Sequence, residues 1–253
     1  MDEASQNIFK NLFKFLDIRE KDGIYESELF KLSLVDKELV FLDDFPFKEE
    51  YCYIFLSKHK SESNIPSLTA HFPGNIGYDK SLGGREREVA YSFPSLLQSY
   101  MKNLFNLHEK VQEYKITLEP THHGPTQSRA PLLFIELGSG EKNWKDERAG
   151  ETLCEALIKT LREEVKLNES AIALGGPHYS EKFTKFLIKE DLPLSHIIPK
   201  YSLEYLDGFM MEQITKKSIQ PIKYALLDWK GLGKEKDRII KLIKEFGLEI
   251  IKI

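Results

Sequence analysis

The sequence predicts an α/β protein in which a mixed, largely parallel sheet lies between layers of helices. In the second half, stretches of strand length alternate with longer amphipathic stretches, the pattern of repeated strand–helix units. The stretch PLLFIELG, residues 131–138, is almost continuously apolar, as expected of a strand that is covered on both faces. No linker-like stretch divides the 253 residues, so we expect a single domain over residues 1–253.

The first third is expected to form one helix followed by short strands. Apolar residues recur at helical spacing between Ile8 and Leu16, and Ser5 stands where a helix N-cap is favourable. Stretches rich in β-forming residues follow at 28–34, 37–44 and 51–59. Residues 57–88 show no clear periodicity and are rich in Ser, Pro, Gly and Asn, so we predict a long, functional loop there.

Helices and strands alternate through the rest of the chain. A helix over about residues 94–112 starts with proline, which costs little in the first turn because an N–H there has no partner within the helix. Strands are expected at 113–120 and 131–138. The remaining expected elements are helix 146–166, strand 170–176, helix 180–189, helix 206–217, strand 222–229, helix 234–246 and strand 249–253.

Composition excludes several classes of protein. The net charge of -4 argues against generic binding to polyanions, so any contact with RNA must be local. Cys52 and Cys154 are too few for a disulfide framework or a cysteine-based zinc site, and they fit a reducing cytosol. No apolar stretch is long enough to span a membrane, and the start MDEASQNIFKNLF is acidic where a signal peptide is basic. We therefore expect a cytoplasmic protein without a membrane partner.

Six of the seven histidines fall in Gly- and Pro-rich contexts that follow expected strands or lie in the long loop. They are His59, His71, His122, His123, His178 and His196, whereas His108 lies in an ordinary charged helix. Ligands of open α/β sheets bind beyond the carboxyl ends of strands, so LEPTHHGP and LGGPHYS indicate the expected site. Any single loop histidine can also be a plain structural residue.

These residue types suit a metal site. Neutral imidazole is a common ligand, and catalytic zinc takes three histidine or carboxylate ligands. His122 and His123 would point to opposite faces of a regular strand, so they can share a metal only if the backbone turns at Gly124 and Pro125; otherwise one ligates and the other contacts substrate. No spacing matches HExxH or paired CxxC. The predicted zinc ligands are His71, His122, His123, His178 and Glu119.

A carboxylate interrupts the apolar stretch FIELG. Glu136 would be buried there, and a buried carboxylate needs a metal, an arginine or a histidine as its partner. It is therefore a candidate ligand or general base. The predicted catalytic residues are His122, His123, Glu136 and His178.

Six motifs together resemble one enzyme family. SLTAHFPGN, LEPTHHGPT, FIELGSGEKNWKDERAGE, ALGGPHYSEKFTK, HIIPKY and DWKG, in this order, resemble the D-aminoacyl-tRNA deacylases of the archaeal and plant type, from about Ala4 to the C-terminus. The resemblance implies a zinc-associated enzyme that hydrolyses the ester between a D-amino acid and tRNA. It also implies a three-layer α/β/α fold related to the phosphorylase/hydrolase and peptidyl-tRNA hydrolase group.

The family's histidine-bearing segments match all six motif histidines, and its carboxylates match Glu119 and Glu136. Family members usually begin with a strand ahead of the segment matching DEASQNIF, so either the sheet lacks a strand or the start codon lies upstream.

The resemblance thus predicts chiral proofreading by a zinc-activated water, in a monomer that binds the acceptor end of tRNA. The expected substrate and tRNA contacts are His59, His196, Lys200, Lys230, Lys234, Lys236 and Arg238, of which the last three can also be a solvated helix face. Two alternatives remain: a zinc-dependent amidase or peptidase of related fold, and an RNA- or metal-binding module without turnover.

Overall fold

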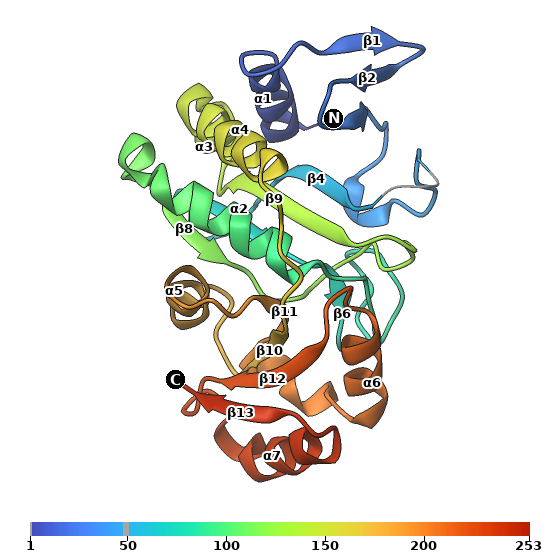
Figure 1. Cartoon of the computed structure of the whole chain (residues 1–253), viewed down its shortest axis with the longest axis vertical. Coiled ribbons are helices and arrows are strands. Elements are labelled where there is room, and N and C mark those ends of the chain that lie inside the picture. Colours follow the sequence, from blue (N-terminus) through green and yellow to red (C-terminus); the bar gives the residue numbers. More distant parts are fainter. Residues whose placement is uncertain (1, 48–50) are drawn as a thin grey trace.

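Two four-stranded sheets and the helices around them make up the computed structural model, which describes residues 2–47 and 51–253 (Figure 1). The predicted α/β class is confirmed. A small antiparallel sheet of β1 (Arg19–Lys21), β2 (Ile24–Glu26) and β3 (Lys31–Ser33) lies near the N-terminus, and β6 (Gly74–Asn75) pairs with β7 (Glu88–Val89).

The first large sheet is mixed. Its strand order is β4 (Tyr53–Lys58), β9 (Leu132–Gly138), β5 (Ser67–His71) and β8 (Lys115–Leu118). Strand β9 is parallel to β4 and antiparallel to β5, which is itself parallel to β8. Every residue of β9 is buried, as its apolar sequence predicts.

The second large sheet is entirely parallel, in the order β11 (Leu194–Ile198), β10 (Ser170–Leu174), β12 (Ile222–Leu227) and β13 (Glu249–Lys252). The N–H of Thr121, just beyond β8, donates to the carbonyl of Ile197 in β11 at 2.8 Å. This bond ties the two sheets together directly beside His122.

Except for the short α3, which the sequence did not predict, the α-helices lie close to their predicted positions. They are α1 (Glu3–Leu12), α2 (Pro94–Asn106), α3 (Glu141–Trp144), α4 (Glu147–Arg162), α5 (Glu181–Lys189), α6 (Gly208–Lys216) and α7 (Lys236–Glu245), with short 3₁₀ turns η1 (Leu39–Phe41), η2 (His108–Val111), η3 (Lys200–Tyr205) and η4 (Gly233–Glu235). No helix in the described part of the chain is long and apolar enough to cross a membrane.

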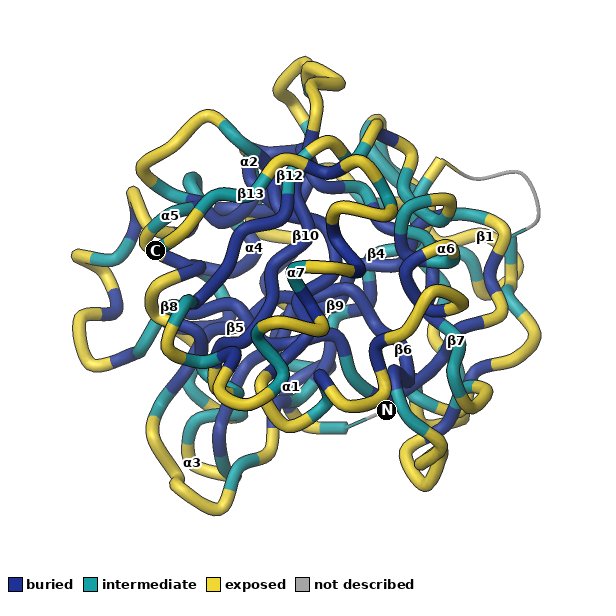
Figure 2. The backbone as a smooth tube through the Cα atoms, turned by 90° about the horizontal axis from the view of Figure 1, so that it is seen from below, coloured by how far each residue is buried: buried dark blue, intermediate teal, exposed yellow. Residues whose placement is uncertain are grey.

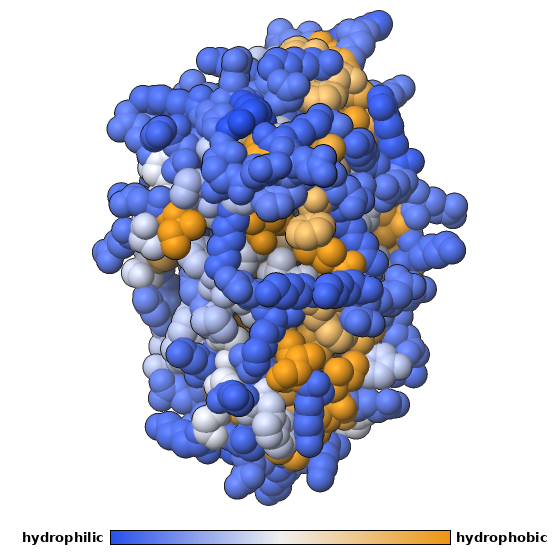
Figure 3. Space-filling model, turned by 90° about the vertical axis from the view of Figure 1, so that its left-hand side faces the viewer, coloured by the Kyte–Doolittle hydropathy of each residue, from blue (hydrophilic) through white to orange (hydrophobic). Residues whose placement is uncertain are grey.

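One apolar core extends through both sheets. It contains Leu68 and Leu133 of the mixed sheet, Ala171 and Leu226 of the parallel sheet, and buried residues of α1, α2, α4 and α5. Strands β5, β9, β10 and β12 run through the buried centre in Figure 2, while exposed loops lie at its periphery. The face of the surface shown in Figure 3 is mostly hydrophilic, with apolar patches between the charged side chains.

The structure departs from the sequence-based predictions at several places. Asp2, not Ser5, caps α1, because its carboxylate accepts from the N–H of Ser5 at 2.9 Å. Residues 37–44 contain the 3₁₀ turn η1 rather than a strand, and the sequence did not predict the hairpin of β1 and β2.

The predicted loop 57–88 contains the buried strand β5, and LSHII forms the unexpected strand β11. In β5, Ser67, Thr69 and His71 occupy the alternate positions, and in β11 the adjacent polar residues Ser195 and His196 interrupt the apolar residues.

Candidate active site and metal-binding residues

The site lies on one face of the mixed sheet. Side chains alternate across a strand, so Leu68 and Ala70 of β5 face the helices while Thr69 and His71 face the opposite side. Strand register extends this polar face sideways, because Thr69 pairs with Glu136 in β9 and with Thr117 in β8. The predicted site beyond the strand ends is therefore only part of the arrangement, because His71 and Glu136 lie within the buried strands β5 and β9.

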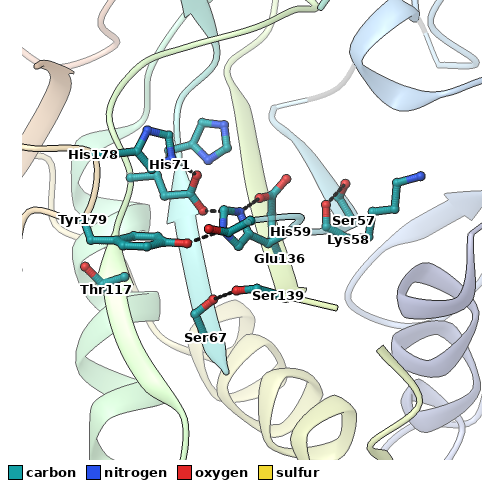
Figure 4. A network of polar contacts seen from close by, with 12 residues as sticks. Ser57, Lys58, His59, Ser67, His71, Thr117, Glu136, Ser139, His178 and Tyr179 are labelled. Atoms are coloured by element: carbon teal, nitrogen blue, oxygen red, sulfur yellow. Dashed lines mark hydrogen bonds and ion pairs between the residues drawn. The ribbon is translucent and has the colours of Figure 1, made fainter. Parts of the chain in front are cut away.

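His59, the residue after β4, is held between two carboxylates. Its Nδ1 lies 2.9 Å from Glu119 Oε1 and 3.3 Å from Glu136 Oε2, and its Nε2 lies 2.6 Å from the hydroxyl of Tyr179 (Figure 4). Burial lowers the pKa of His59, but the contacts with Glu119 and Glu136 outweigh it and raise that pKa to about 11. His59 is therefore a buried imidazolium at neutral pH.

The pKa values of Glu119 and Glu136 are shifted in opposite directions. Burial raises the pKa of Glu136 to about 7, although His59 opposes the shift. Burial also acts on Glu119, but His178 and His59 together hold the pKa of Glu119 well below its usual range. Glu136 therefore matches the expectation of a buried carboxylate with a histidine partner, and it can exchange a proton near neutral pH.

Three imidazoles cluster beside these carboxylates. His71 Nε2 and His123 Nε2 are 3.1 Å apart, and the ring centroids of His122 and His123 are 4.3 Å apart. The backbone turn that this requires is present, since His123 has a φ of 46°.

All three imidazoles have lowered pKa values. Burial, with the neighbouring imidazoles, holds the pKa of His71 well below its usual range, lowers that of His122, and lowers that of His123 to about 3. These rings are therefore neutral at pH 7, the form that binds metal.

Backbone carbonyls determine which ring nitrogens can accept. His122 Nδ1 lies 2.7 Å from the carbonyl of Pro120, and His123 Nδ1 lies 2.6 Å from that of Gly124, so each Nδ1 carries the proton. The Nε2 lone pair of His122 then faces Glu119 Oε2 at 3.5 Å. A lone pair facing a carboxylate is repulsive, and a cation between them would remove the repulsion.

An unpaired buried atom gives a second indication of a cation. His71 Nδ1 is buried without a hydrogen-bond partner among the described residues. The ligand atoms of His71, His122 and His123 lie within 4.8 Å of one another, and so do those of Glu119, His122 and His178. These two groups share His122 and contain all five predicted metal ligands. A carbonyl that orients a histidine through its second nitrogen is typical of metal sites.

Comparison with known proteins decides the family. A family model described as D-aminoacyl-tRNA deacylase matches residues 47–251. The chain belongs to the D-aminoacyl-tRNA deacylase family. Archaeal D-aminoacyl-tRNA deacylases are similar to it over nearly their whole length. The protein of Cenarchaeum symbiosum is 36% identical over 99% of this chain and 96% of its own. That of Pyrococcus furiosus is 32% identical over 100% of this chain and 97% of its own.

The family resemblance of the six motifs is thereby confirmed, and a solved structure bears out the fold. The crystal structure of a conserved protein of unknown function superposes with a TM-score of 0.91 at 28% identity, covering 99% of this chain and 92% of the other. This member of the D-aminoacyl-tRNA deacylase family therefore combines the expected α/β architecture with a buried histidine and carboxylate cluster.

Two tyrosines of this deacylase-family site were not predicted. Tyr179 contacts His59, and the hydroxyl of Tyr201 lies 3.2 Å from His178 Nδ1. Tyr179 belongs to the motif GGPHYS and Tyr201 to HIIPKY, so these motifs are the sequence feature that could have indicated the two tyrosines. The side chain of His178 is 40% exposed and Tyr201 as a whole is 51% exposed, which places both residues at the mouth of the site.

His196 lies apart from the cluster. It is fully buried in β11, where Nε2 lies 3.0 Å from the carbonyl of Ala90 and Nδ1 lies 3.1 Å from Ser195 Oγ. His108 also lies elsewhere, with Nε2 3.1 Å from the carbonyl of Tyr114. Arg238 donates to the carbonyls of Leu203 and Leu206. The lysines predicted to contact tRNA lie in or next to η3, η4 and α7.

Because His196 is buried, we expect the free energy of unfolding to decrease as the pH falls into the acid range. Burial lowers its pKa to about 4 from 6.5, so the unfolded chain takes up its proton first as pH falls. The contribution of His196 is complete above pH 6.5 and is lost as pH falls through 4, about 3 kcal/mol in all. Urea unfolding between pH 7 and 4 should show a shallower decline for His196→Gln than for the wild type. Parallel declines would contradict this account.

Proposed function

We propose that the protein hydrolyses the ester bond of D-aminoacyl-tRNA and releases the free D-amino acid and tRNA. Membership of the family supports this, and the observation that carries it is the buried cluster of neutral imidazoles beside Glu119 and Glu136. An aminoacyl ester is already activated, so a polarised carbonyl and a positioned water suffice. The reaction removes D-amino acids from tRNA, a chiral proofreading step that also protects the cell from D-amino acids.

Zinc is the cofactor that we propose for this site. His71, His122 and His123 would hold it, with Glu119 and His178 completing the second group around His122. When bound, zinc supplies a Lewis acid and lowers the pKa of a water molecule. Imidazole and carboxylate are the ligand types that it takes, and the lowered histidine pKa values keep these ligands available at neutral pH.

The chain's own residues have separate roles in this proposal. Glu136 titrates near neutral pH, so it can accept the proton of the attacking water. His59 stays charged and holds both carboxylates in place, while His178 contacts the substrate at the mouth. As residues that would hold zinc, His122 and His123 also fix where the ester carbonyl and the water can lie.

Contacts with tRNA must be local because the net charge is -4. We propose Lys200, Lys230, Lys234 and Lys236 as contacts for the acceptor end. Arg238 belongs to the same group of contacts, and its guanidinium also pairs with Glu235 at 2.8 Å. A cytoplasmic monomer of a single domain completes the proposal.

An enantiomer comparison tests the function. D-Tyr-tRNA and L-Tyr-tRNA are incubated separately with purified protein, together with an N-acyl amino acid amide as a substrate for the alternative amidase activity. We expect rapid release of tyrosine from the D-ester only. Hydrolysis of the amide but not of the ester would favour the amidase, and tRNA binding without turnover would favour a binding module.

A further inference from the structure

A cavity of about 820 Å³ opens from the reaction centre toward the N-terminal region. One end is polar and is formed by His59, His122, His123, His178 and Glu136. The other walls combine apolar side chains with charged ones, among them Asp2, Glu38 and Lys58. The apolar lining residues come from α1, residues 32–40, edge strand β4 and a loop: Phe9, Leu32, Leu34, Val35, Leu39, Val40, Ile54, Phe55, Leu56 and Leu82.

Backbone contacts hold part of this apolar wall against the histidines. The N–H of Gly124 donates to the carbonyl of Leu82 at 3.0 Å. A Cβ at Gly83 would lie 1.9 Å from the carbonyl oxygen of Val40, and one at Gly124 would lie 2.5 Å from the same oxygen. Only glycine allows so close an approach, so Val40 and Leu82 are fixed beside His123.

The substrate's connectivity limits what can enter the cavity. The ester carbonyl must lie at the histidines, and the side chain of the amino acid begins one atom beyond that carbonyl. The folded tRNA is far too large for 820 Å³, so it must leave the site through the open mouth near His178 and Tyr201. The apolar wall at Val40 and Leu82 is then the surface left for the amino-acid side chain.

We propose that this cavity receives the side chain of the D-amino acid and that Leu82 and Val40 limit the size it accepts. The inference rests on the proposed deacylase function. The cavity is larger than any amino-acid side chain, and its wall at Val40 and Leu82 offers apolar contact beside the histidines. The wild-type enzyme therefore accepts a range of side chains, with large apolar and aromatic ones favoured by the area they bury.

Narrowing the cavity tests the inference. Leu82 is 57% exposed, so Leu82→Trp adds bulk at the wall without disturbing the core. We expect the ratio of kcat/KM for D-Tyr-tRNA to kcat/KM for D-Ala-tRNA to fall at least ~10-fold, the scale of steric discrimination in an apolar pocket. The matched control is Leu167→Trp, a leucine 61% exposed and outside the cavity lining, which should keep the wild-type ratio.

Thermal unfolding of each variant verifies that it is folded, and Val40→Phe provides a second narrowing at an independent position. An unchanged ratio in both narrowed variants, with the wild type active on both esters, overturns the cavity assignment but not the deacylase function. A wild-type protein that cleaves neither ester overturns the function and this inference with it.

Discussion

Replacing His122 by alanine is expected to lower the turnover of D-aminoacyl-tRNA by at least ~100-fold, the scale of losing a metal-ligand or acid–base function. His122 belongs to two of the three potential metal groups among the described residues, so its loss disrupts both of these. His123→Asn should have a comparable effect, and asparagine tolerates the positive φ of 46° at this position. Single-turnover rates with D-Tyr-tRNA measure both losses.

The same variants should remain folded. His122 contributes little apolar area to the core, so the loss in the free energy of unfolding should stay within ~0.5–3 kcal/mol. His108→Ala is the control, because His108 lies outside the cluster and should leave turnover unchanged. If folded His122→Ala and His123→Asn proteins both turn over at the wild-type rate, the catalytic interpretation of LEPTHHGPT is wrong.

Removing metal is expected to reduce deacylation by at least ~100-fold, since a bound metal contributes several kcal/mol to transition-state stabilisation. Purified protein should contain zinc by elemental analysis, and added zinc should restore activity after chelation. Zinc should also raise the thermal unfolding midpoint, because a ligand that binds only the folded state stabilises it.

Glu119→Gln should lose zinc together with activity, since it replaces a fully buried carboxylate of a potential metal group. Glu164→Gln, at an exposed position outside the site, is the matched control and should retain both. Full activity in protein shown to be free of metal would refute the zinc proposal while leaving the deacylase function intact.

Local sequence pattern was sufficient for most of the secondary structure. Strands β9, β10 and β12 and helices α4 and α7 lie where their apolar residues predict, because each buries a face that its own periodicity defines. Strand β5 was missed because SLTAH has polar residues at three of its five positions. Its period of two was present in the sequence, but burial of the polar face depends on the neighbouring strands.

The α/β class, the family and the residue types of the site can all be read from the amino-acid sequence. Glycine and proline beside histidine in LEPTHHGPT and GGPHYS indicated these segments without reference to any partner. Which of these side chains contact one another became clear only from the folded chain.

His59 reaches Glu119 and Tyr179, far away in sequence, whereas His196 is turned into the core toward Ala90. Such long-range contacts depend on strand order and register, which are set by the packing of the whole sheet rather than by local propensity.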